Sequence, residues 1–284
     1  MSNAANIPGA ARDVDERSWT YWTTPSTVVV DGLETAFRRS GTGETVVYLH
    51  GEGATRAWLP LHQELASGVD LIVPEHPGFG DTERPSDFNR VDDWVLHYES
   101  FFRTLGLSRI HLVGHSFGGY LAAQLAVYFP DRFQSVTLIN PMGLRLHGEP
   151  LRDRFRWTPE EEDSHWFNGR RDLLLEQLTR EGSPEQDVQA YAELTSIALL
   201  LWNPRYDTKL DYRLARLTAP LLSIGVDDDR VVGNQMATRF AELASNGHFT
   251  RITGGHEAPS SHQVVLEQPE DVAAAVIQHV IANS

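Results

Sequence analysis

Several residue types and patterns are missing from this sequence of 284 residues. It contains no cysteine, which excludes thiol nucleophiles, cysteine metal sites and disulfides. No apolar run is long enough to span a bilayer, and the N-terminus lacks an apolar core of signal-peptide length. We therefore expect a cytoplasmic protein without a membrane span.

Positive charge is scarce. The 24 Lys and Arg residues stand against 39 Asp and Glu residues, which gives a formal net charge of -15. Nucleic acids and anionic membranes bind clustered Lys and Arg, so neither is an expected partner. Metal-ligand spacing is also missing, since the acidic run 227–229 lacks the glycine and the distal glutamate of a calcium loop. We expect neither a metal nor a cofactor.

The residues that are present alternate between strand-like and helix-like segments. A hairpin is predicted over residues 26–41, turning at Asp31-Gly32. Apolar runs at 44–51, 109–114 and 135–140 are typical of buried strands, and the stretches 91–107 and 117–129 are typical of helices. This alternation predicts an α/β fold with a mostly parallel sheet and helices on both faces.

The alternation stops after Asn140 and resumes near residue 217. The stretch between is charged, rich in aromatic residues and helical in pattern, so we interpret residues 141–216 as a helical insertion, a lid on the core. The core then comprises residues 26–140 and 217–284, preceded by an N-terminal arm over residues 1–25. Apolar side chains of the insertion could roof a pocket for a small molecule with an apolar portion; they include Phe155, Trp157, Trp166, Phe167 and Trp202.

The segment "GHSFGG" carries the clearest chemical signal. Its G-x-S-x-G pattern follows a predicted strand and precedes a predicted helix, which is the setting of a nucleophile elbow. Glycines on both sides of Ser116 permit a sharp turn that exposes the serine Oγ at the helix N-terminus. We expect Ser116 to be a nucleophile.

A second glycine turn, "HGEG", follows another predicted strand. At this position a backbone N–H can face a developing oxyanion, together with the N–H of the residue after the nucleophile. The two expected donors are the backbone N–H groups of Glu52 and Phe117.

These motifs resemble those of the α/β-hydrolase superfamily over nearly the whole chain. "HGEG" is similar to the family's oxyanion loop, "PEHPGFGDTERP" to its next loop, and residues 141–216 stand where its members carry a lid. The resemblance implies an acid and then a histidine after the serine. Two departures are Glu52, a carboxylate beside the oxyanion site, and Glu75, where an aspartate is usual. A serine nucleophile argues against the family's epoxide hydrolases and haloalkane dehalogenases, which use aspartate.

The acid is expected in "PLLSIGVDDDRVVG". Counting nine residues from Pro220 selects Asp229, which the family's Arg-hydrophobic-Val pattern then follows. Counting from Gly225 selects Asp228 instead. We favour Asp229 and keep Asp228 as the alternative.

Two histidines compete for the role of base. The Gly-His signal directly after the last predicted strand selects His256, whereas the spacing to the final helix selects His262. We favour His256, because a strand end positions a base more directly than helix spacing does, and keep His262 as the alternative.

The expected function is a cofactor-independent serine hydrolase of a carboxylic ester, lactone or thioester, acting through a Ser-His-Asp triad and an acyl-enzyme. A C–C bond hydrolase of diketone ring-cleavage products is an alternative within the fold. Those enzymes usually have Asn where this sequence has His115. A non-catalytic ligand-binding protein on the same fold is a further alternative.

Overall fold

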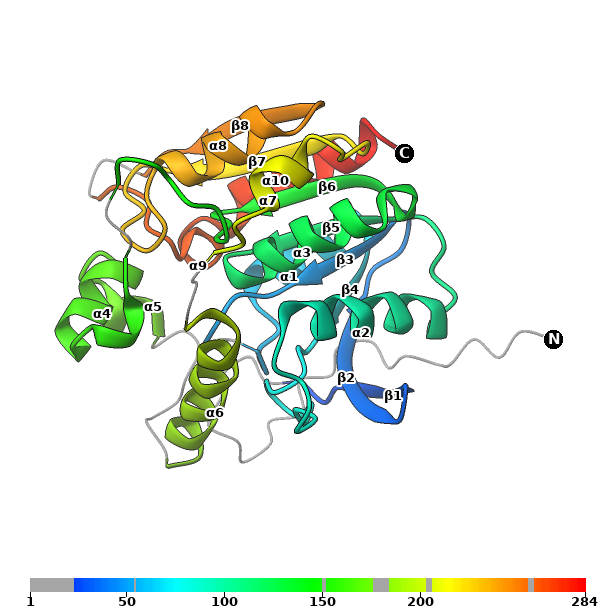
Figure 1. The fold of residues 1–284 in the computed structure, drawn as a ribbon, viewed down its shortest axis with the longest axis horizontal. Helices are drawn as coiled ribbons and strands as arrows, with labels where there is room; N and C mark the ends of the chain where they lie inside the picture. Colours follow the sequence, from blue (N-terminus) through cyan, green and yellow to red (C-terminus); the bar gives the residue numbers. More distant parts are fainter. Residues whose placement is uncertain (1–22, 54, 150–151, 176–183, 203–205, 255–257) are drawn as a thin grey trace.

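The computed structural model describes residues 23–53, 55–149, 152–175, 184–202, 206–254 and 258–284 (Figure 1). Their strands form one sheet in the order β1-β2-β4-β3-β5-β6-β7-β8. The strands are β1 Ser26–Val30, β2 Leu33–Ser40, β3 Thr45–Leu49, β4 Asp70–Pro74, β5 Ile110–His115, β6 Phe133–Ile139, β7 Leu221–Val226 and β8 Gly247–Ile252.

The sheet is antiparallel at one edge and parallel elsewhere. Strand β2 pairs antiparallel with both β1 and β4, and every other pair is parallel. The predicted hairpin closes with Val30 opposite Leu33, so Asp31 and Gly32 form a two-residue turn with φ of 49° and 89°. Positive φ at both positions is the geometry that Asp-Gly turns favour. The predicted α/β fold with a mostly parallel sheet is confirmed.

Helices cover both faces of this sheet. Helices α1 and α10 pack on each other and on one face, whereas α2, α3, α7 and α8 pack on the other (Figure 1). The helices are α1 Pro60–Ala66, α2 Val91–Thr104, α3 Phe117–Tyr128, α4 Pro159–Trp166, α5 Arg171–Leu175, α6 Pro184–Leu201, α7 Leu210–Leu214, α8 Gln235–Leu243, α9 Val264–Glu267 and α10 Pro269–Ile281; the short 3-10 turns are η1 Pro130–Arg132 and η2 Arg154–Arg156.

Helices α4 to α7 and the turn η2 all lie between β6 and β7. The predicted insertion over residues 141–216 therefore falls on a helical stretch that interrupts the α/β alternation. Its boundaries, its function as a lid and the arm over residues 1–25 remain predictions, and residues 1–22 lie outside the described part. Within the described residues, no helix has the length and apolar character needed to cross a membrane.

Helix α3 packs unusually close to the central strands. A Cβ added at Gly118 would lie 2.1 Å from the carbonyl oxygen of Leu49, at the end of β3. A Cβ added at Gly114, in β5, would lie 2.3 Å from the carbonyl oxygen of Gly118. Backbone atoms cannot yield as a flexible side chain can. Only glycine at these two positions lets α3 begin directly over the ends of β3 and β5.

A buried ion pair fixes the end of β4. Arg38 Nη1 donates to Glu75 Oε1 at 2.6 Å, and both side chains are almost fully buried. Burial raises the pKa of Glu75, an effect that the Arg38 guanidinium opposes. The other carboxylate oxygen accepts the backbone N–H of Asp81. The glutamate at position 75, where an aspartate is usual, thus reaches both Arg38 and the N–H of Asp81.

We predict that Arg38→Met lowers the free energy of unfolding by about 3–5 kcal/mol, because it leaves the Glu75 carboxylate buried without its cation. The double variant Arg38→Met/Glu75→Leu should recover much of this loss, since no buried charge remains. Urea unfolding of Arg38→Met, Glu75→Leu and the double variant tests this. Simple addition of the two single losses would contradict it.

Candidate active site

Ser116 occupies the corner between β5 and α3. Its φ of 53° and ψ of -114° lie in a region that non-glycine residues rarely adopt. Backbone hydrogen bonds hold this strained turn in place. The N–H of Ser116 donates to Ile139 O at 2.9 Å, and the carbonyl oxygen of Ser116 accepts the N–H groups of Tyr120 and Met142. The geometry is that of a nucleophile elbow.

Three side chains from distant parts of the chain meet at this corner. His262 Nε2 lies 2.8 Å from Ser116 Oγ, and His262 Nδ1 lies 2.8 Å from Asp229 Oδ2. All three residues are buried, at no more than 4% exposure. Asp229 follows β7, and His262 lies between β8 and α9. The arrangement can move a proton from the serine hydroxyl to an imidazole whose other nitrogen faces a carboxylate.

The Asp229 carboxylate is held in its ionised form. Its Oδ1 accepts the backbone N–H groups of Val231 and Val232, each at 2.9 Å. Burial alone raises the pKa of Asp229, but His262 and these two N–H groups outweigh it and bring the pKa below its ordinary value. An ionised carboxylate accepts the Nδ1 proton, which leaves Nε2 of His262 free to accept a proton from Ser116.

The backbone of His262 is anchored from two sides. Its carbonyl oxygen accepts one hydrogen bond from His115 Nε2 and another from Asn140 Nδ2, both at 3.0 Å. Burial lowers the pKa of His115 to about 3, so its ring is neutral, and its single proton lies on Nε2 because that nitrogen faces a carbonyl oxygen. His115 and Asn140 therefore position His262 without contacting Ser116 Oγ themselves.

The loop before His262 is tied to the loop that carries the acid. Ser260 O accepts the N–H of Asp228 at 3.1 Å. Both Ser261 N and Ser261 Oγ donate to the Glu267 carboxylate, at 2.8 and 2.6 Å. These contacts fix the turn that presents the His262 ring to Asp229.

The predicted site residues are thus distributed as follows. Ser116, Asp229 and His262, the alternative base, are brought together. His256, which the sequence analysis favoured as the base, lies outside the described residues. Asp228, the alternative acid, directs its carboxylate to Arg230 Nε at 2.9 Å.

The loop predicted to stabilise an oxyanion lies against Ser116. A Cβ added at Gly51 would meet His115 Nδ1 at 2.8 Å and Ser116 Cβ at 3.2 Å, so only glycine fits there. His50 Nε2 accepts the backbone N–H of His76 at 3.2 Å, which leaves the ring proton of His50 on Nδ1. That nitrogen donates to Gly51 O at 2.6 Å. The carbonyl of Gly51 shares its peptide unit with the N–H of Glu52, so His50 fixes the direction of that N–H.

The second expected donor, the N–H of Phe117, belongs to the first residue of α3. The N–H groups of a first helical turn have no partner inside the helix and carry the positive end of its dipole. Helix α3 begins at the elbow, so this N–H is available to a negatively charged oxygen beside Ser116.

The Glu52 side chain does not add uncompensated charge to this site, because its carboxylate forms an ion pair with Arg154 in η2. The Arg154 guanidinium also lies over the ring of Trp166, 4.9 Å from its centre. The Trp166 ring meets the His262 ring edge-on at 5.0 Å. Sequence reasoning missed Arg154 and the anchors His115 and Asn140. Arg154 stood in a stretch that alternates bases with acids, as solvated surfaces do.

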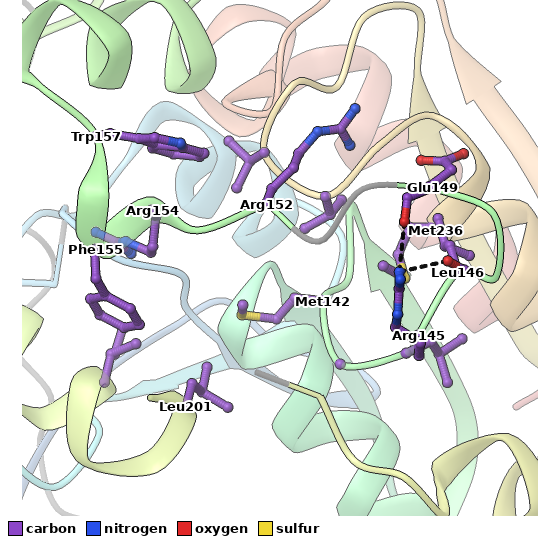
Figure 2. A pocket seen from close by; sticks show the side chains of 15 residues that line it. Met142, Arg145, Leu146, Glu149, Arg152, Arg154, Phe155, Trp157, Leu201 and Met236 are labelled. Atoms are coloured by element: carbon purple, nitrogen blue, oxygen red, sulfur yellow. Dashed lines mark hydrogen bonds between the residues drawn. The ribbon is translucent and has the colours of Figure 1, made fainter. Parts of the chain in front are cut away.

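A pocket adjoins this group of residues (Figure 2). Met142, in its wall, donates its N–H to Ser116 O, and Val231 and Val232 donate theirs to Asp229. Most of its lining is apolar, with Leu144, Leu146, Phe155, Trp157, Ile197, Leu201 and Met236 completing the apolar part. Two of the predicted aromatic residues, Phe155 and Trp157, are in this wall, whereas Trp202 is 59% exposed.

Arginines and one glutamate complete the pocket wall. Arg145 Nη1 donates to the carbonyl oxygens of Leu146 and Glu149 at 2.7 and 2.8 Å, which Figure 2 marks with dashed lines. Arg152, Arg154 and Glu149 also line it. Among the described residues, no group of three or more His, Cys, Asp and Glu side chains is arranged to hold a metal ion.

Comparison with known proteins establishes the family. The model of the "Alpha/beta hydrolase family" matches residues 46–275, and the chain belongs to this family. Among curated proteins, the chain is 36% identical over 122 residues to 2-hydroxy-6-oxo-2,4-heptadienoate hydrolase of Pseudomonas putida. That match covers 41% of this chain and 44% of the relative, so the chain spans less than half the length of this relative.

Solved structures share the fold at lower sequence identity. The meta-cleavage product hydrolase of Pseudomonas fluorescens IP01 has a TM-score of 0.74 at 22% identity, over 92% of this chain and 99% of that one. A thermophilic esterase from Thermogutta terrifontis has a TM-score of 0.72 at 21% identity, over 92% of this chain and 100% of that one. At these identities the likeness concerns the fold alone.

We predict that Asp229→Asn lowers the free energy of unfolding by about 1.5–3 kcal/mol at pH 7, because it weakens three hydrogen bonds to an ionised carboxylate. The folded pKa of Asp229 lies below its unfolded value. The stability that its charge contributes is therefore complete above the unfolded pKa of about 3.9 and is lost as the pH falls through the folded pKa. Urea unfolding of both proteins along a pH series measures this, and a difference that is independent of pH would contradict it.

Proposed function

We propose that this chain is a cofactor-independent serine hydrolase of a carboxylic ester, lactone or thioester. The observation that carries the proposal is the continuous hydrogen-bonded chain Ser116–His262–Asp229, with 2.8 Å at each step. The family membership supports it, since the chain belongs to the alpha/beta hydrolases. The proposal assigns the role of base to His262 rather than to His256.

The reaction would proceed in two halves. His262 Nε2 removes the proton from Ser116 Oγ as the oxygen attacks the carbonyl carbon, and Asp229 stabilises the imidazolium that forms. The carbonyl oxygen becomes an oxyanion, which the N–H groups of Glu52 and Phe117 stabilise. His262 then protonates the leaving alcohol or thiol. A water molecule resolves the acyl-enzyme with the same base, and Ser116 regains its proton.

The pocket supports a substrate with an apolar portion. Its aliphatic and aromatic wall adjoins Ser116 and Asp229 through Met142, Val231 and Val232. Apolar pockets of this kind bind the hydrocarbon part of a ligand, while a few polar groups fix its orientation. In this proposal the insertion acts as a lid over the acyl group, with Phe155 and Trp157 in contact with it.

A C–C bond hydrolase of diketone ring-cleavage products is the second candidate. The 36% identity to 2-hydroxy-6-oxo-2,4-heptadienoate hydrolase favours it, and it would use the same serine, base and oxyanion donors. His115, where such enzymes usually have Asn, weighs against it. A non-catalytic binding protein is less well supported, because strained backbone and buried hydrogen bonds at Ser116 would then have no role.

We predict that a fluorophosphonate forms one covalent adduct, on Ser116, identified by mass spectrometry of the digested protein. His262→Ala should slow labelling at least about a thousandfold, because the base is lost, whereas His256→Ala should stay within about fivefold of the wild type. Ser116→Ala is the control for specific labelling. Loss of labelling in His256→Ala alone would assign the base to His256. No adduct in the wild type would reject the hydrolase.

A panel of p-nitrophenyl esters and a 2-hydroxy-6-oxo-2,4-dienoate separates the two candidates. We expect ester turnover with a higher kcat/KM for short or medium acyl chains than for long ones, because aromatic side chains close the pocket wall. Cleavage of the dienoate with a higher kcat/KM than any ester would instead favour the C–C hydrolase.

A further inference from the structure

Helix α6 of the insertion presents one polar face to the loops around the candidate site. Gln189, Glu193 and Ser196 follow one another at spacings of four and three residues, which places them on the same side of the helix. Ser196 Oγ lies 3.2 Å from Gly78 O and 3.0 Å from Ala192 O in its own helix, and it can donate its proton to either. Glu193 and Ser196 are buried although the helix carries exposed apolar residues elsewhere.

Glu193 is a buried carboxylate that reaches the loop carrying Glu52. It is 4% exposed, and its Oε2 accepts the backbone N–H of Gly53 at 3.3 Å. Its Oε1 accepts Gln189 Nε2 at 2.8 Å. Burial raises the pKa of Glu193, and its contacts with Gln189, Thr55, Gly53 and Gly80 oppose that rise. A buried carboxylate is unfavourable unless such partners surround it, so a loop conformation that withdrew the Gly53 N–H would leave Glu193 with one partner fewer.

The contact bears directly on the expected oxyanion donor. The N–H of Gly53 belongs to the peptide unit that follows Glu52, and the carbonyl of Gly51 belongs to the unit that precedes it. His50 fixes the preceding unit from the core, through its 2.6 Å hydrogen bond to Gly51 O. Glu193 fixes the following unit from the insertion. The two planes meet at the Cα of Glu52, so His50 restrains the plane that holds the Glu52 N–H directly, and Glu193 restrains it through the φ and ψ angles of Glu52.

We propose that Glu193 is a positioning residue for the oxyanion site: by holding the Gly53 N–H, it makes the alignment of the Glu52 N–H depend on the docking of α6. This inference rests on the proposed function. Glu193 need not contact the substrate, because it acts through the peptide backbone. The expected signature is a defect in transition-state stabilisation with little change in substrate binding.

The chain provides a matched control. Ser196 lies on the same helix face and is also buried, but its hydroxyl contacts Gly78 in the neighbouring loop rather than the peptide next to Glu52. Ser196→Ala therefore removes the hydroxyl that Gly78 O shares with Ala192 O of α6, and it keeps the contact to Gly53. Glu193→Gln keeps an oxygen that can accept the Gly53 N–H, whereas Glu193→Leu removes this acceptor. Glu193→Asp keeps a carboxylate on a side chain that is shorter by one methylene.

The experiment measures kcat and KM for a p-nitrophenyl ester, and the rate of fluorophosphonate labelling of Ser116, in the 284-residue wild-type chain and these four variants. Removal of one oxyanion donor costs about 10²–10³ in kcat, so its misalignment in Glu193→Leu should lower kcat by about 10–100-fold. Labelling should slow in parallel, and KM should stay within about twofold. Glu193→Gln should retain kcat within about threefold, and Ser196→Ala within about twofold.

The outcomes separate this inference from the proposed function. An unreactive wild type rejects the proposed function, and the inference with it. A reactive wild type with an unchanged kcat in Glu193→Leu rejects the inference alone. An equal loss of kcat in Ser196→Ala also rejects the inference, because any change in the contacts of α6 would then be enough to lower kcat. If thermal unfolding shows that Glu193→Leu does not fold, Glu193→Asp decides: a loss of kcat at constant KM supports the inference, and full activity rejects it.

Discussion

The close approach of α3 to the ends of β3 and β5 is the constraint on which the candidate site depends. Gly118 lies against the carbonyl oxygens of Leu49 and His50, and Gly114 lies against the backbone of Gly118. Because no side chain separates these elements, the turn between β5 and α3 is tight enough to force Ser116 to a φ of 53°. The same contact brings the start of α3 beside the loop that follows β3, so Phe117 and the loop residue Gly51 lie next to one serine. The sharp turn at Ser116 and the approach of the loop that follows β3 are two results of one packing requirement.

Buried neutral histidines then hold the backbone around this corner. His50 directs the peptide unit of Glu52, and His115 holds the carbonyl of His262. Burial lowers the pKa of His50 to about 4 and that of His115 to about 3, so each ring carries a single proton, and its hydrogen-bond partners fix where that proton lies. A neutral imidazole is both donor and acceptor, and it can therefore link two backbone groups in a dry interior where a charged side chain would be costly. These histidines organise the site without having to exchange protons with it.

Sequence reasoning succeeded where a local pattern determines the structure. The Asp31-Gly32 hairpin and the mostly parallel sheet followed from turn chemistry and apolar runs. The same kind of pattern led to Ser116 and Asp229, which the structure places in one hydrogen-bonded group. The favoured base, His256, lies outside the described residues and stays a prediction, which depends on a strand-end rule that assumes a short connection from β8. The position of His262 instead depends on contacts between Asp228 and Ser260 and between Ser261 and Glu267, which no local pattern reveals. The contact of Glu193 could not be predicted for the same reason, since its partner Gly53 is 140 residues away in the sequence.

The insertion is joined to each loop of the site by directional polar contacts. Arg170 donates to Glu267 and to Pro259 O beside the His262 loop, Asn168 donates to Asp228 O, and Glu193 accepts from Gly53. A purely apolar cover could slide over these loops at little cost, but hydrogen bonds are lost as soon as their geometry changes. Displacement of α6 would leave the Glu193 carboxylate and the Gly53 N–H without each other, and an unpaired buried polar group costs more than the bond contributes. The position of α6 and the conformation of the loop that carries Gly53 are therefore energetically coupled.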